Sequence, residues 1–109
     1  GWAMEARINA RRPGKITALN VPGGNGVRFD GFIYQNYSVV PFYDSMIAKL
    51  IVHSATREQA VQKLLCALDE LVIDGIETNI EEQKNILQSK KFLSGNFGTG
   101  LYAELFSQK

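Results

Sequence analysis

A regular alternation of apolar and polar side chains opens the chain. From Met4 to Asn9 every second residue falls on one face, which is the period of a strand with a single buried face. A turn at Pro13-Gly14 and a return segment from Lys15 to Val21 predict that this strand belongs to a β-hairpin. The polar face of the first strand carries Glu5, Arg7 and Asn9.

Further short strands are predicted in the first half. Asn25-Gly26 favours a type I′ hairpin turn, because that turn needs two successive residues with positive φ. The strands expected after it are Val27 to Phe29, Phe32 to Tyr34, Tyr37 to Val40 and Ser45 to His53.

The second half changes to the helical period. Thr56 and Gln59 have the spacing of a capping box, and the apolar stripe behind them predicts a helix up to Leu71. Thr78 and Glu81 repeat that spacing and predict the start of a second helix.

The order of these elements indicates the fold class. The second helix is expected to end near Ser89, and a short third helix is expected from Thr99 to Phe106. Strands first and helices afterwards are typical of an α+β fold, with antiparallel β-strands from the first half packed against two to three helices from the second. A length of 109 residues, 45% of them hydrophobic, predicts one domain over residues 1–109.

Charge and cysteine content narrow the class of partner. A net charge of +1 argues against a nucleic-acid partner, and no apolar run is long enough for a membrane span. A single cysteine suits the cytoplasm. Four basic residues lie between Glu5 and Lys15, and six acidic residues lie between Asp69 and Glu82. These segments are either two solvated faces or a basic edge beside an anionic substrate.

Most of the reactive side chains lack a catalytic context. His53 has no cysteine or carboxylate at metal-ligand spacing, so no metal site is expected. Cys66 lies opposite the leucine stripe of its helix without a neighbouring base. The glycine-rich segments at Gly14 and at Gly23 to Gly26 lead into strands, which favours turns over phosphate-binding loops.

The polar face of the first strand is the most informative feature. Arg7 lies between Glu5 and Asn9 on a rigid element, so its planar guanidinium is held ready to donate two hydrogen bonds to a carboxylate or to a carbonyl oxygen that gains charge. A surface ion pair is the alternative. Asp44 and Lys49 form another candidate pair, because Lys49 lies between isoleucines and needs solvent or a charge.

Five segments follow one another in order along nearly the whole chain: Met4 to Ala10, Pro13 to Ile16, Pro22 to Arg28, Pro41 to Ile51 and Asp74 to Asn79. Together they resemble the C-terminal domain of biotin carboxylase. Only Arg11 and Arg12 stand where that family has a longer loop, so the loop is either truly short or missing a stretch.

The resemblance implies a share in the ATP-dependent carboxylation of carrier-bound biotin by bicarbonate. Arg7 matches the family arginine that contacts the biotin ureido oxygen, with Glu5 and Asn9 as orienting neighbours. Arg28 matches a residue of the dimer interface, and Asp44 matches a residue near it.

The resemblance also implies partners and a division of labour. ATP and Mg²⁺ would be bound by a nucleotide-binding domain that has no counterpart here, so the isolated chain should be inactive. The expected partners are the biotin carboxyl carrier domain, the carboxyltransferase subunits of an acetyl-CoA carboxylase that feeds fatty acid synthesis, and a second copy of the enzyme. The alternative is a stand-alone module that binds a protein or a carrier domain and has no catalytic role.

Overall fold

The computed structural model describes residues 1–31, 33–39, 45–88 and 101–105. In chain order the elements are β1 (Trp2–Ala10), β2 (Gly14–Lys15), β3 (Ala18–Asn20), β4 (Val27–Gly31), β5 (Ser38–Val39), β6 (Ser45–Ser54), α1 (Arg57–Glu70), β7 (Val72–Asp74), α2 (Ile80–Gln88) and β8 (Leu101–Leu105).

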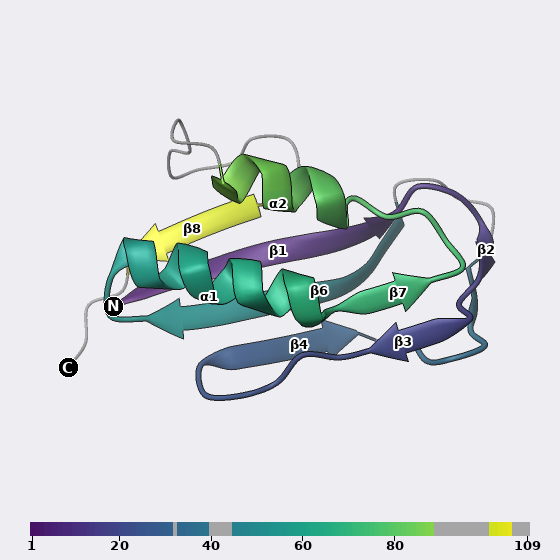
Figure 1. Cartoon of the computed structure of the whole chain (residues 1–109), viewed down its shortest axis with the longest axis horizontal. Helices are drawn as coiled ribbons and strands as arrows, with labels where there is room; N and C mark the ends of the chain where they lie inside the picture. The colour runs from purple at the N-terminus through teal and green to yellow at the C-terminus, as the bar shows by residue number, and fades with distance from the viewer. Residues whose placement is uncertain (32, 40–44, 89–100, 106–109) are drawn as a thin grey trace.

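A four-stranded antiparallel sheet and two helices form the body of the molecule. The strand order is β4-β6-β1-β8, and two small two-stranded sheets, β2-β5 and β3-β7, flank it. Both helices lie over the same face of the large sheet (Figure 1). The fold is therefore α+β, as the sequence predicts, with a second face of the sheet that neither helix covers.

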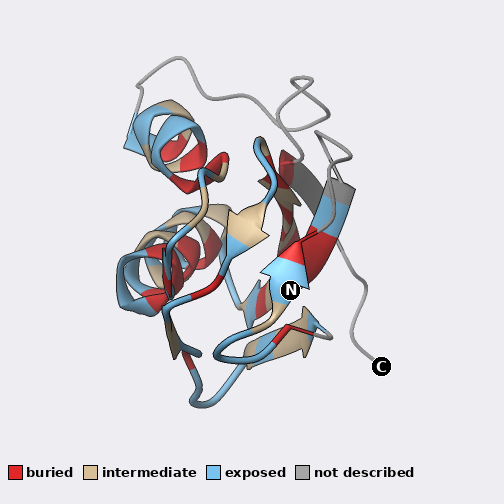
Figure 2. Ribbon diagram, turned by 90° about the vertical axis from the view of Figure 1, so that its right-hand side faces the viewer, coloured by how far each residue is buried: buried red, intermediate tan, exposed pale blue. Residues whose placement is uncertain are grey.

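The core lies between this sheet and the helices. The apolar residues of β1 alternate as predicted, with Met4, Ala6 and Ile8 buried. Leu64 and Leu68 of α1 are fully buried against them. Figure 2 shows the buried residues on the facing surfaces of the helices and the sheet. The polar residues of β1 consequently point to the open face.

The cap predicted for α1 is confirmed, whereas the contact predicted between Thr78 and Glu81 at the start of α2 is not the one observed. The Thr56 side chain accepts a hydrogen bond from the Gln59 N–H at 3.1 Å, as expected of an N-cap. In α2 the Thr78 hydroxyl accepts from the N–H of Ile80, at 3.4 Å, rather than from that of Glu81. No helix among the described residues has the length and apolar character of a membrane span.

An ion-pair cluster joins the two helices. The Lys84 Nζ lies 3.1 Å from Asp69 Oδ1 and 3.1 Å from Glu81 Oε1. The hydrogen bonds to Asp69 and then to Glu81 raise the pKa of Lys84, so the ammonium stays charged at neutral pH. The cluster fixes α2 to the end of α1.

The predicted hairpin between the first strand and the segment from Lys15 to Val21 is wrong. β1 pairs with β6 and β8, so both of its edges are occupied. The segment divides instead into β2, which pairs with β5, and β3, which pairs with β7. Pairing with β6 and β8 is favoured over the local hairpin because it places β1 inside the sheet, where its apolar face is buried.

Two turn predictions also need correction. Gly26 has positive φ but Asn25 does not, so the turn closed by the Val27 N–H and the Gly24 carbonyl is not type I′. It also joins strands of different sheets, which do not need the twist of a tight hairpin. The predicted strand from Phe32 to Tyr34 lies partly outside the described residues, and Tyr34 belongs to a turn with Tyr37.

The predicted helix from Thr99 to Phe106 is wrong within the described residues. Leu101–Leu105 forms β8, which pairs with β1 from Trp2 to Ala6. A helix this short has little intrinsic stability, whereas a strand satisfies the hydrogen-bonding groups along an open edge of β1. The pairing also buries Leu101 completely.

Gly75 allows two parts of the backbone to approach closely. Its φ is 100°, and a Cβ atom there would collide with the carbonyl oxygen of Lys15. The neighbouring Asp74 carbonyl accepts a hydrogen bond from the Thr17 N–H at 2.8 Å, which holds the two segments together. Only glycine combines this backbone conformation with this contact.

We expect Gly75→Ala to lower the free energy of unfolding by more than about 2 kcal/mol, because alanine adds both backbone strain and a steric clash. Gly23→Ala is the matched control, since no atom lies within 4 Å of its added methyl group, and it should change stability by less than about 0.5 kcal/mol. Urea unfolding of both variants measures the difference. Equal stabilities would contradict this account of Gly75.

Candidate functional site

The open face of the sheet carries a row of charged side chains across three strands. Arg7 on β1 lies opposite Lys49 on β6, which in turn lies opposite Asp30 on β4. One step along, Glu5 and Arg28 flank Ile51 in the same way. The site therefore consists of residues that the sheet register brings together.

Glu5 forms an ion pair with the guanidinium of Arg7. The two side chains are two residues apart on one strand and therefore share a face. Arg7 Nε donates to Glu5 Oε2 at 2.7 Å, and the exposed fractions of the two side chains are 43% and 25%. The Arg7 side chain is thus held by a carboxylate and reachable from solvent. The structure thus contains the ion pair that the sequence left open as the alternative, and the role of Glu5 as an orienting neighbour stays a prediction.

The backbone of Arg7 is held by two side chains that the sequence analysis did not single out. The Arg7 carbonyl accepts hydrogen bonds from Asn79 Nδ2 at 3.0 Å and from Gln83 Nε2 at 2.9 Å. Asn79 Oδ1 accepts from the Asn9 N–H at 2.9 Å. Asn9, a predicted orienting neighbour, is thus linked to Arg7 through its backbone. The sequence signal that could have indicated this contact is Gln83, a polar residue on the apolar stripe of α2.

Lys49 adds a second positive charge beside Arg7. Like charges directly opposite on neighbouring strands repel each other unless an anion lies near. Lys49 has no ion-pair partner among the residues that the structure describes, whereas Arg7 has Glu5 and Arg28 has Asp30. Within the described residues, the row therefore has more positive than negative side chains, with Arg7, Arg28 and Lys49 against Glu5 and Asp30.

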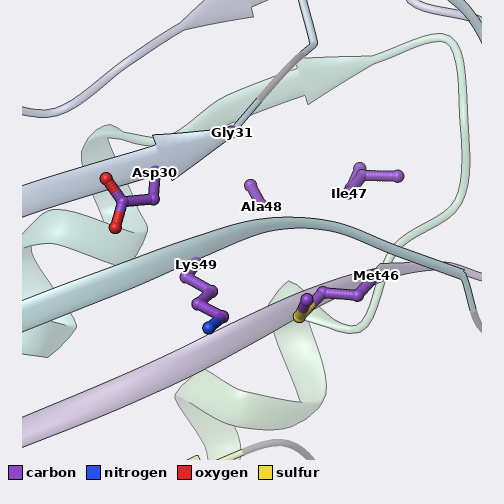
Figure 3. A pocket seen from close by; sticks show the side chains of 6 residues that line it. All are labelled: Asp30, Gly31, Met46, Ile47, Ala48 and Lys49. Atoms are coloured by element: carbon purple, nitrogen blue, oxygen red, sulfur yellow. The ribbon is translucent and has the colours of Figure 1, made fainter.

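A shallow hollow of about 260 Å³ lies beside this row, where β4 meets β6. Figure 3 shows the Lys49 side chain pointing toward β1 and away from Asp30. Met46, which is 45% exposed, supplies apolar surface at the other end of the hollow. Its lining residues are Asp30, Gly31, Met46, Ile47, Ala48 and Lys49.

The structure describes one of the two predicted interface residues, and the interface role of both stays a prediction. Arg28 lies on β4, where its Nε contacts Asp30 Oδ1 at 3.0 Å and its side chain is 70% exposed. Its position at the border of the open face makes it accessible to another chain. Asp44 lies outside the described residues, so its suggested pairing with Lys49 remains a prediction.

The basic and acidic segments of the sequence meet at the end of β1. Arg11 contacts Glu82 at 2.9 Å, and Arg12 contacts Glu77 at 2.8 Å. These pairs lie at the surface. They join the segment after β1 to α2 and to the residues just before it, and so pair two residues of the basic segment with two of the acidic segment.

The remaining reactive residues form no further site within the described ranges. His53 and Cys66 are both exposed, and no group of three His, Cys, Asp or Glu side chains there could hold a metal ion. Gly26 precedes β4 and Gly14 begins β2, so neither lies at the start of a helix. These residues do not fit a site for Mg²⁺ or for the phosphates of a nucleotide.

Comparison with known proteins identifies the family. Residues 5–104 match the family model described as the biotin carboxylase C-terminal domain. The chain belongs to this family. Biotin carboxylase of Haemophilus influenzae is 48% identical over 109 residues, which cover 94% of this chain and 24% of that protein. Biotin carboxylase 1 of Bacillus subtilis is 46% identical over 107 residues, which cover 91% of this chain and 24% of that protein.

Solved structures of biotin carboxylases share the fold. The biotin carboxylase of Campylobacter jejuni, described as a β-γ-ATP complex, superposes with a TM-score of 0.79 at 40% identity, covering 83% of this chain and 22% of that one. The biotin carboxylase domain dimer of Hydrogenobacter thermophilus 2-oxoglutarate carboxylase has the same TM-score and coverage at 38% identity. This biotin carboxylase C-terminal domain spans about a quarter of the length of its curated relatives.

Proposed function

We propose that this chain is the C-terminal domain of an ATP-dependent biotin carboxylase and that Arg7 binds the ureido oxygen of biotin. The observation that carries the proposal is the position of Arg7 on the open face of the sheet, oriented by Glu5 at 2.7 Å, in a member of this family. The chain would complete a biotin pocket whose other walls belong to the rest of the enzyme.

The chemistry of the ureido group explains the need for a fixed cation. Loss of the proton from the ureido N1 spreads negative charge onto the ureido oxygen, and the guanidinium of Arg7 stabilises that charge where it develops. Because the Glu5 carboxylate accepts from Arg7 Nε, the guanidinium keeps one orientation, and little reorganisation is needed during the reaction. The charge of Lys49 on the neighbouring strand favours the same anion.

The step that uses ATP to activate bicarbonate would take place in another part of the enzyme. ATP, Mg²⁺ and bicarbonate would bind outside this chain, and a carrier domain would deliver biotin to its open face. We place the enzyme in the cytoplasm as the biotin carboxylase of an acetyl-CoA carboxylase, whose carboxyltransferase subunits use the carboxylated biotin in fatty acid synthesis. The proposal draws on the relatives named biotin carboxylase at 46% and 48% identity.

We expect both Arg7→Ala and Arg7→Lys to lower the biotin-dependent rate of ADP release by the full-length enzyme about a hundredfold or more. Alanine removes the charge, and lysine lacks the planar guanidinium that donates two hydrogen bonds. The rate is measured at saturating ATP and bicarbonate, and the KM for ATP should not change. Arg12→Lys is the matched control, since Arg12 also pairs through Nε with a carboxylate at 2.8 Å. Rates near wild type in both Arg7 variants would contradict the role of Arg7.

The purified 109-residue chain is expected to release no ADP in the presence of ATP, bicarbonate, Mg²⁺ and biotin. A single oriented arginine stabilises charge on biotin but cannot activate bicarbonate. The full-length enzyme serves as the positive control in the same coupled assay. Biotin-dependent ADP release above the enzyme-free blank would show that the chain contains a nucleotide site of its own.

We also propose that Arg28 and Asp44 lie at the interface of a homodimer. Arg28→Glu in the full-length enzyme should shift sedimentation toward the monomer, because it reverses the charge of a side chain that is 70% exposed at the border of the open face. Arg12→Glu is the matched control, with an arginine side chain that is 77% exposed and also paired with a carboxylate. An unchanged dimer in the Arg28 variant would place the interface elsewhere.

A further inference from the structure

Two amide side chains pair with the backbone of β1 beside Arg7. Within the described residues β8 pairs with β1 from Trp2 to Ala6, and the backbone groups of the next residues of β1 also need partners. Asn79 supplies both an acceptor and a donor. Its Oδ1 accepts from the Asn9 N–H at 2.9 Å, and its Nδ2 donates to the Arg7 carbonyl at 3.0 Å. A neighbouring strand would make the same donor and acceptor contacts.

Gln83 strengthens this arrangement from the next turn of α2. Its Nε2 donates to the same Arg7 carbonyl at 2.9 Å, so one oxygen accepts from two amides. Asn79 and Gln83 are 0% exposed and are the buried polar side chains of the described core. A buried amide N–H is costly without an acceptor, so Asn79 Nδ2 and Gln83 Nε2 hold the Arg7 carbonyl that they contact.

The residues that the amides hold lie beside an irregularity in the pairing of β1 with β6. The register between β1 and β6 shifts between Ile8 and Asn9, where Ile47 of β6 is an extra residue that stands opposite no residue of β1. A bulge changes the local twist and re-aims the adjacent side chains. Asn79 bridges the backbone on both sides of this irregularity, from Arg7 to Asn9, and so fixes the direction in which Arg7 leaves the strand.

We propose that Asn79 and Gln83 are positioning residues that hold the backbone of Arg7 in the orientation required for carboxylation of biotin. The inference rests on the proposed function of Arg7. Glu5 orients the guanidinium on the open face of the sheet, while Asn79 and Gln83 hold the Arg7 carbonyl from the side of the helices. Because a displacement of about 1 Å at a reacting centre can cost about a hundredfold in rate, a clamp on the main chain bears directly on catalysis.

The test uses the full-length enzyme with Asn79→Ala and, separately, Gln83→Met, which retains most of the side-chain volume while removing the donor. Each should lower kcat for biotin-dependent ADP release about ten- to a hundredfold and leave the KM for ATP unchanged. Asn20→Ala is the matched control, because Asn20 also donates its amide to a backbone carbonyl, that of Glu70 at 2.7 Å, but is exposed. Its rate should equal that of the wild type.

A double-mutant cycle separates positioning from general damage. In the Arg7→Ala background, Asn79→Ala and Gln83→Met should lower the rate less than about twofold, because the group they position is already gone. The same fold-loss in both backgrounds overturns the inference, as do wild-type rates in both single variants. If Asn79→Ala unfolds the enzyme, the Gln83→Met cycle decides alone.

The cycle also keeps this inference distinct from the proposed function. A normal rate for Arg7→Ala overturns the role of Arg7 and, with it, the positioning role of Asn79 and Gln83. A low rate for Arg7→Ala, combined with normal rates for both amide variants, overturns the clamp alone.

Discussion

The pairing of β1 along both of its edges is the interaction on which the sheet, the core and the site depend. β6 pairs with its whole length, and β8 pairs with the part from Trp2 to Ala6. A central strand cannot shift register without moving its apolar residues out of the core, because a slip of one residue exchanges the two faces. The same constraint that buries Met4 and Ile8 therefore keeps Glu5 and Arg7 on the open face.

The sequence predicts what depends on near neighbours. The two-residue period places Glu5 and Arg7 together without knowledge of the partner strands, and the Thr56 cap starts α1. Strand partners are not local, and the competition for the edges of β1 left the predicted hairpin and the predicted third helix incorrect. An isolated pattern from Thr99 to Phe106 does not reveal that Leu101 fills a place beside Ala6.

The same limit applies to the site. Glu5 contacts Arg7 from two residues away, whereas Asn79 and Gln83 are more than 70 residues from it in sequence. Gln83 lies on the buried stripe of α2 between Ile80 and Leu87, where a polar residue signals a specific buried partner. The signal exists in the sequence, but the identity of its partner requires the tertiary structure.

Two kinds of side-chain contact join β1 and the residues after it to α2 and the residues before it, and their energies assign them different roles. The pairs of Arg11 with Glu82 and of Arg12 with Glu77 lie at the surface, where such pairs contribute about 0–1 kcal/mol each. Leaving a buried amide or carbonyl without its partner costs about 1–3 kcal/mol. The ion pairs therefore help to bring the two elements together, while the amides on the Arg7 carbonyl define their exact position. That division allows the surface charges to vary without moving Arg7.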